Sequence, residues 1–258
     1  MNTKNAQVVF KWIYRLTNVV IRNPSALTGR YKYIFILSHM RGYTSLLSHI
    51  LGGHPEISGY FELHQRYRGS FDLFLMRIRV ANGMNYQVRG SYLLDKVLHS
   101  KWFLSPKILQ REDVFTIFTI RKPEGSLKSL MYMREKLGFP KDSLEYYIER
   151  LDSLKDMSHI PYNRLYLDGE LLVDNTNPVL ESLRSFLQLG ENISASYSTF
   201  KFTGEGGFGD RSEFIKQGKI VKDRDAHSEF HISPDVLQKA TEAYDETRHV
   251  LIENCLSI

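Results

Sequence analysis

The chain has 258 residues, of which 42% are hydrophobic and 24% charged, a composition that excludes a disordered protein and fits a globular domain. The formal net charge of +5 suits an anionic ligand without specifying one, and the single cysteine, Cys255, excludes an internal disulfide and a cysteine-cluster metal site. No apolar run reaches the ~18 residues of a membrane span. Because no signal peptide is recognisable either, we expect a cytoplasmic protein.

The N-terminal segment, residues 1–28, is expected to form a helix over residues 5–22 that ends before Pro24. Basic residues, Lys11 and Arg15 among them, interrupt its apolar positions. We expect this helix to pack on the domain. The alternative is a basic amphipathic helix that makes peripheral contact with a membrane.

Strand-like apolar runs alternate with helical patterns along the rest of the chain. The predicted strands are residues 31–37, 114–120 and 164–167. The predicted helices are residues 44–51, 70–82, 123–137, 143–157, 178–190 and 234–255. The glycine-rich stretch 202–225 has no clear period and is interpreted as a functional loop. This alternation predicts a single domain, residues 1–258, built as a three-layer α/β/α sandwich around a mostly parallel sheet.

The loop that follows the first predicted strand has the features of an anion site. Ligands of open α/β sheets bind beyond the carboxyl ends of strands, where backbone N–H groups and a helix N-terminus favour negative charge. The Arg41 guanidinium adds a forked cation, and neighbouring hydroxyls add further donors. The alternative is an ordinary helix cap beside a surface arginine. The predicted phosphate- or sulfate-binding residues are Arg41, Gly42, Tyr43, Thr44 and Ser45.

The stretch FILSHMRGYTSLLSHILGGHPEISGYFELH resembles the donor-binding region of sulfotransferases. The family pattern runs Pro, Arg or Lys, Ser, Gly, Thr, Thr or Ser, Leu, Leu, then a short helix and His-Pro-Glu. Met40, Gly42 and Tyr43 depart from this pattern, and the glycine lost at position 43 would let the backbone approach the phosphosulfate. We expect Gly42 to supply that freedom instead. The matching residues are Arg41, Thr44, Ser45, Leu46, Leu47 and His54-Pro55-Glu56.

A second motif follows the strand at 114–120. Arg121 and Ser129, eight positions apart, resemble the pair that holds the 3′-phosphate of the sulfate donor in the same family. An arginine at a strand end and a serine after about two turns of helix could both reach one dianion. The alternative is an arginine in a salt bridge and a serine on a helix surface.

Two weaker similarities lie downstream. Gly169 stands where the tyrosine of the family's Tyr-Glu-x-Leu segment would be, before Glu170. Residues 209–212, within the 202–225 stretch, resemble the family's donor-covering loop. The basic pair that precedes this loop in many relatives is replaced by Gly204-Glu205. The candidates to replace it are Lys216 and Lys219.

The resemblance implies an enzyme that transfers a sulfuryl group from 3′-phosphoadenylyl sulfate (PAPS) to a hydroxyl or amine of a carbohydrate, lipid or other small molecule. The product would be adenosine 3′,5′-bisphosphate (PAP), with no metal and no nucleic acid involved. Arg41 would stabilise developing charge, and a general base would take the acceptor's proton.

Two residues compete for the role of base. Glu62 sits where tyrosylprotein and several carbohydrate sulfotransferases carry a catalytic glutamate. His99 lies in a segment, residues 95–99, that resembles the Lys-Thr-His of the cytosolic steroid and phenol enzymes, with one extra residue. Glu62 is our first choice. The structural alternatives are a surface glutamate and a histidine at a helix end.

Two other functions fit parts of the sequence. A P-loop kinase or phosphotransferase would share the architecture, but it needs magnesium ligands that we cannot identify in the sequence. A non-catalytic polyanion-binding module would need an exposed basic face. The candidate residues for that face are Arg66, Arg68, Arg77 and Arg79.

Overall fold

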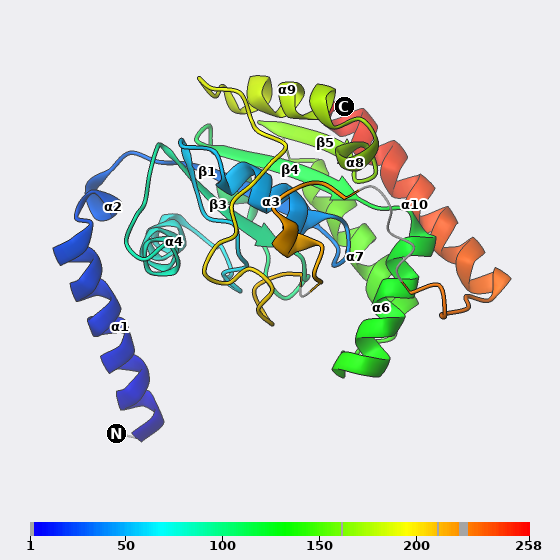
Figure 1. Ribbon diagram of the computed structural model, residues 1–258, viewed down its shortest axis with the longest axis horizontal. Helices are drawn as coiled ribbons and strands as arrows, with labels where there is room; N and C mark the ends of the chain where they lie inside the picture. Colours follow the sequence, from blue (N-terminus) through cyan, green and yellow to red (C-terminus); the bar gives the residue numbers. More distant parts are fainter. Residues whose placement is uncertain (1–2, 161, 211, 222–226) are drawn as a thin grey trace.

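An all-parallel sheet forms the centre of the protein (Figure 1). The structure is a computed structural model that describes residues 3–160, 162–210, 212–221 and 227–258, with side chains from Ile13 onwards. Within these residues the sheet has six strands, in the order β2-β3-β1-β4-β5-β6. Their bounds are β1 Lys32–Ser38, β2 Ile57–Ser58, β3 Tyr92–Val97, β4 Val114–Ile120, β5 Arg164–Asp168 and β6 Leu256–Ser257. The predicted fold class is confirmed.

The central strands are buried on both faces, which explains their nearly continuous apolar sequences. In β1, Ile34 and Ile36 pack into one core while Phe35 and Leu37 pack into the other. The chain leaves β1 for β3 on one side and later adds β4 on the other side. The carboxyl end of β1 is therefore a topological switch point, where open α/β sheets bind their ligands.

Helices cover both faces of the sheet (Figure 1). One face carries α4, α6, α7 and α10, and the other carries α3, α8 and α9. None of the described helices is long and apolar enough to span a bilayer. The bounds are α1 Thr3–Arg22, α2 Ser25–Thr28, α3 Thr44–Gly52, α4 Ser70–Gly83, α5 Pro106–Leu109, α6 Pro123–Leu137, α7 Ser143–Ser158, α8 Leu171–Asp174, α9 Thr176–Leu187, the 3₁₀ helix η1 Ile215–Gln217 and α10 Pro234–Asn254.

The three predicted strands and the long predicted helices are present within a few residues of their expected bounds. The central strand β3 was not predicted, because Asp95 and Lys96 interrupt its apolar sequence. The Asp95 carboxylate accepts hydrogen bonds from the Leu63 backbone N–H (2.9 Å) and the Tyr67 hydroxyl (2.6 Å). This bonding allows a charged residue to be buried in the sheet. His99 consequently follows a strand, and the structural alternative that placed it at a helix end is wrong.

Candidate functional site

The loop after β1 enters α3 through two left-handed residues. Arg41 has φ 68° and Tyr43, the N-cap of α3, has φ 59°. Gly42, which was expected to let the backbone approach the phosphosulfate, is not one of the residues with positive φ. Gly42 is needed for space instead, because a Cβ there would lie 2.6 Å from the Ser38 hydroxyl oxygen. The turn places backbone N–H groups at the N-terminus of α3, as in anion-binding nests.

The two predicted anion motifs meet in one pocket. Arg41 Nε donates a hydrogen bond to the Ser129 hydroxyl oxygen (2.6 Å), although 88 residues separate them. Arg121 Nη1 donates to the Arg41 carbonyl oxygen (3.4 Å). Of the seven predicted binding residues, Gly42 alone is outside the pocket lining. The lining residues are Arg41, Tyr43, Thr44, Ser45, Leu46, Arg121, Gly125, Ser129, Tyr197, Asp210, Ser212, Phe214, Ile215 and His227.

Space for the Arg121 guanidinium comes from the first turn of α6. A Cβ on Gly125 would lie 2.5 Å from Arg121 Nη2, so the glycine allows the side chain to fold back over the helix N-terminus. Glu170 Oε1 lies 4.0 Å from Arg121 Nε and accepts a hydrogen bond from the Lys122 backbone N–H (3.1 Å). Burial raises the pKa of Glu170. The alternative interpretation of Arg121, a salt bridge, is therefore met only by this long contact with Glu170 beside the pocket.

Two of the departures from the sulfotransferase pattern, Tyr43 and Gly169, are neighbours in space. A Cβ on Gly169 would lie 3.2 Å from Tyr43 Cδ2. On its other side, the Tyr43 ring centroid lies 4.5 Å from the Arg121 guanidinium carbon, a cation–π distance. The ring therefore takes the space that a larger residue at position 169 would need, and it holds Arg121 in the pocket.

Three buried side chains of α7 support the loops at the carboxyl ends of β1, β3 and β4. The Tyr146 hydroxyl donates a hydrogen bond to the Leu98 carbonyl (2.8 Å) and the Tyr147 hydroxyl donates to the Arg121 carbonyl (2.7 Å). Arg150 Nε donates to the carbonyl at the end of β1 (2.8 Å). Helical periodicity placed these residues in a core-facing helix, but it gave no sign of their bonds to the loops.

His39 connects the two anion motifs directly. Its Nδ1–H donates to the Met40 carbonyl (2.7 Å), and its Nε2 accepts a hydrogen bond from the Arg121 backbone N–H (3.0 Å). The side chain is fully buried, and burial lowers the pKa of His39 to about 4. A neutral imidazole is required here, because only that form can donate from one nitrogen and accept at the other.

Part of the stretch 202–225, which was expected to be a functional loop, lines the pocket through Asp210, Ser212, Phe214 and Ile215; Arg211 and residues 222–226 lie outside the described residues. The Asp210 backbone N–H donates to the Ser45 hydroxyl oxygen (2.9 Å), and Arg41 Nη1 donates to the Asp210 carboxylate (3.0 Å). Burial alone would raise the pKa of Asp210, but Arg41 and the Ser212 hydrogen bonds lower it. Lys216 pairs with Glu213 (2.7 Å) and does not line the pocket.

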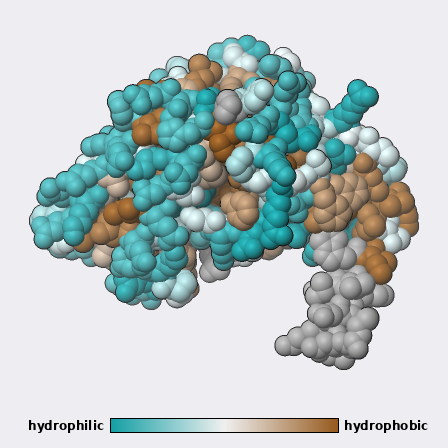
Figure 2. All heavy atoms as spheres, turned by 180° about the vertical axis from the view of Figure 1, so that it is seen from behind, coloured by the Kyte–Doolittle hydropathy of each residue, from teal (hydrophilic) through white to brown (hydrophobic). Residues whose placement is uncertain are grey.

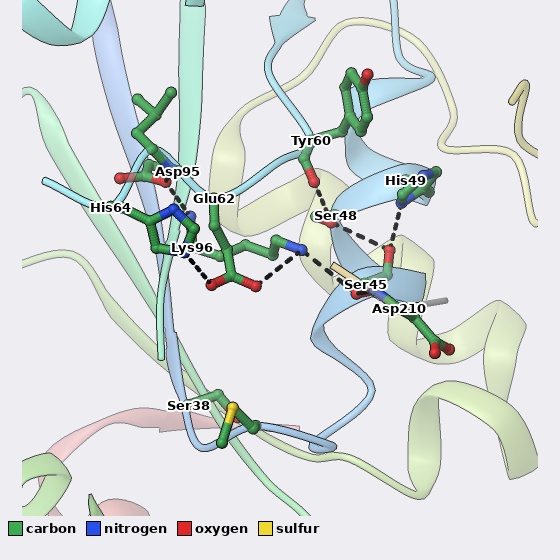
Figure 3. A network of polar contacts seen from close by, with 12 residues as sticks. Ser38, Ser45, Ser48, His49, Tyr60, Glu62, His64, Asp95, Lys96 and Asp210 are labelled. Carbon is green, nitrogen blue, oxygen red and sulfur yellow. Dashed lines mark hydrogen bonds and ion pairs between the residues drawn. The ribbon is translucent and has the colours of Figure 1, made fainter. Parts of the chain in front are cut away.

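Glu62 is linked to the Ser45 hydroxyl by a buried lysine, Lys96 (Figure 3). Lys96 Nζ lies 3.9 Å from Glu62 Oε1 and 3.4 Å from the Ser45 hydroxyl oxygen. The other carboxylate oxygen of Glu62 lies 3.3 Å from His64 Nε2. Burial would raise the pKa of Glu62, but His64 and Lys96 hold it below its usual value. Glu62 is therefore a mostly buried carboxylate, and the sequence-based alternative of a surface residue is wrong.

His99 lies beyond the end of β3, beside the ring of Tyr146 (5.7 Å between centroids). Burial lowers the pKa of His99 to about 4, so the imidazole is neutral at pH 7. Neither His99 nor Glu62 lines the pocket around Arg41. Glu62 is connected through Lys96 to Ser45, which does line the pocket.

The four arginines expected on one basic face are not all available to a ligand. Arg77 Nε donates to the Tyr33 hydroxyl (2.9 Å) and its Nη1 donates to the Gly29 carbonyl (3.0 Å). Arg79 Nη1 donates to the Leu63 carbonyl (2.9 Å). These two side chains bond groups of the protein itself, so the polyanion-binding alternative is left with Arg66 and Arg68, which are exposed.

Comparison with known proteins agrees with this geometry at the level of the fold. No protein-family model matches the sequence, and no curated protein matches it. Among solved structures, the sulfotransferase domain from the Synechococcus PCC 7002 olefin synthase is similar, with a TM-score of 0.51 and 17% identity. The match covers 84% of this chain and 95% of that domain. This chain has a sulfotransferase-like fold.

Proposed function

We propose that the protein transfers a sulfuryl group from PAPS to a hydroxyl or amine of an acceptor. The observation that carries this proposal is the hydrogen bond between Arg41 and Ser129 (2.6 Å), because it joins two anion motifs, 88 residues apart in sequence, in one pocket. A nucleotide with phosphate groups at two ends needs two sets of hydrogen-bond donors within its reach. The sulfotransferase-like fold supports the same reaction class.

The pocket residues divide into two sets. Arg41, Thr44 and Ser45, with the backbone N–H groups at the start of α3, would hold the phosphosulfate end of the donor. Arg121 and Ser129 would hold the 3′-phosphate. The donor supplies the sulfuryl group, and Arg41 stabilises the charge that develops on its oxygens.

Glu62 takes the proton of the acceptor hydroxyl in this proposal. Its low pKa keeps the carboxylate ionised at neutral pH, the form that a base requires. Lys96 positions that carboxylate and connects it to Ser45. The acceptor belongs to the class of hydroxyl- or amine-bearing carbohydrates, lipids or small molecules.

The segment 202–221 must move for the donor to enter. The pocket encloses ≈ 160 Å³, whereas pockets for ligands of nucleotide size hold about 300–1,000 Å³. Asp210 and Ser212 form part of its wall and belong to this segment. The segment therefore acts as a cover over the donor site.

Calorimetric titration of the full chain with PAP, 5′-AMP and ATP–Mg tests the proposal. We expect PAP to bind most tightly, since it alone offers both a 5′- and a 3′-phosphate. Ser129→Ala should weaken PAP binding about tenfold and leave 5′-AMP binding unchanged, as expected for one hydrogen bond to a charged group. Ser182→Ala, on α9, is the matched control.

Two results would overturn the proposal. Tighter binding of ATP–Mg than of PAP would favour a kinase, and equal binding of PAP and 5′-AMP would remove the 3′-phosphate site. Transfer of label from radiolabelled PAPS to phenol, sugar and lipid acceptors then identifies the acceptor class.

A further inference from the structure

The N-terminal helix α1 extends away from the body of the protein (Figure 1). Only its last turns reach the domain, where α1 packs on α4 and α2. Among its described side chains, those of residues 13–22, Val19 is the one that is buried. It packs with Ala26, Ile78 and Ala81 in a small cluster apart from the two main cores. Most of the described side chains of α1 are therefore exposed and do not pack against the domain.

This uncovered surface is apolar. Large hydrophobic side chains are exposed at five positions in residues 13–21, and Figure 2 shows apolar residues gathered where α1 joins the body. The apolar surface continues onto the first turn of α4, because Phe71 (71% exposed) stacks on Phe74, which packs against the Val19 cluster. The exposed fractions in α1 are Ile13 58%, Tyr14 61%, Leu16 39%, Val20 50% and Ile21 73%.

The same helix carries positive charge only. Residues 3–22 contain four basic residues and no aspartate or glutamate. A soluble helix that is exposed on most sides usually carries charges of both signs, whereas a helix with apolar and basic residues alone is typical of binding to anionic lipid surfaces. The basic residues are Lys4, Lys11, Arg15 and Arg22.

We propose that α1 and the start of α4 form a docking surface for an anionic membrane, with the apolar side chains inserted at the level of the headgroups. A second copy of the chain is the other occupant that would cover apolar side chains. Pairing two α1 helices would bring two sets of positive charges together without any negative partner on the helix, whereas anionic headgroups neutralise them. This proposal does not depend on the function of the pocket.

Sedimentation with vesicles of phosphatidylcholine, alone or mixed with phosphatidylserine, tests the docking surface on the full chain. We expect binding to the mixed vesicles and much weaker binding to pure phosphatidylcholine. Lys11→Gln/Arg15→Gln should lower the partition coefficient on mixed vesicles about thirtyfold, given the usual contribution of each basic residue near an anionic surface.

The apolar contribution is tested by Ile13→Ser/Ile21→Ser, which should lower binding by a similar factor, also about thirtyfold. Ile252→Ser, at a 39% exposed position on α10, is the matched control and should bind as the wild type does. Circular dichroism of each variant reports whether the fold is retained, which we expect because Ile13, Arg15, Ile21 and Ile252 are exposed.

Equal binding to both kinds of vesicle, or unchanged binding of both double variants, would overturn the proposal. So would a wild-type chain that stays in the supernatant and forms a dimer in analytical ultracentrifugation that Ile13→Ser/Ile21→Ser dissociates. That result would assign the surface to a second copy of the chain.

Discussion

Replacement of His39 by glutamine should flatten the dependence of stability on pH. The His39 imidazole is fully buried between the Met40 carbonyl and the Arg121 backbone N–H, and it makes both hydrogen bonds only when neutral. A glutamine amide can also donate and accept, but it does not titrate. The substitution therefore removes the titration while retaining groups that can bond both loops.

The magnitude follows from the pKa of His39, about 4 in the folded protein against 6.5 for the ordinary side chain. Between these values the unfolded chain binds the proton and the folded chain does not, so the free energy of unfolding falls as pH falls from 6.5 towards 4. The slope is about 1.4 kcal/mol per pH unit, and the total is about 3 kcal/mol. At pH 7, His39→Gln should itself cost about 1–3 kcal/mol through less favourable hydrogen bonds.

Urea unfolding of both proteins at a series of pH values from 4.5 to 7 (about two and a half units) measures this difference. The wild type should lose more stability than His39→Gln as the pH falls, and the gap between the two proteins should narrow. His231→Gln, at an exposed position, should leave the slope of the wild type unchanged. Parallel pH curves for His39→Gln and the wild type would show that His39 is not the buried neutral link described above.

Three further outcomes are expected. Glu62→Gln should lower turnover of PAPS by at least about a hundredfold, the usual contribution of a general base, and His99→Ala should have a smaller effect; the reverse order would assign the base to His99. Gly169→Tyr should weaken PAP binding about tenfold by displacing Tyr43, and adding Tyr43→Gly should restore it, which calorimetry of both variants can check. Asp210→Asn should strengthen PAP binding about tenfold by removing a negative charge from the pocket, and weaker binding would show that the carboxylate serves the donor.

The pocket around Arg41 could be predicted in large part because its residues follow strands with strong sequence signals. Residues 31–37 and 114–120 are nearly continuous apolar runs, so the loops at Arg41 and Arg121 could be placed at the carboxyl ends of parallel strands. Parallel neighbours end at the same edge of a sheet, and this brings Arg41 and Ser129 together. The resemblance to sulfotransferases added the spacing of Ser129.

The remaining part of the site depends on contacts that a single sequence does not encode locally. Lys96 lies in β3, a strand that could not be recognised in the sequence because it contains charged residues. The ion pair of Lys96 also depends on Glu62, which comes from a separate loop. The Tyr146 and Arg150 side chains occur in an ordinary helical pattern, and only the packing of α7 under the sheet directs them to the loops. The sequence already ranked Glu62 before His99 as the candidate base, and the structure adds the connection of Glu62 to Ser45 through Lys96.

Because Arg41 bonds the Asp210 carboxylate, binding of an anion at Arg41 competes with closure of the segment that carries Asp210. A guanidinium that satisfies a phosphate has fewer hydrogen bonds for the carboxylate, so a tightly bound anion loosens the segment that carries Asp210. By reciprocity, any change that fastens this segment more firmly must weaken anion binding by the same factor. A cover of this kind would resist trapping a bound anion, because the anion would compete directly with closure.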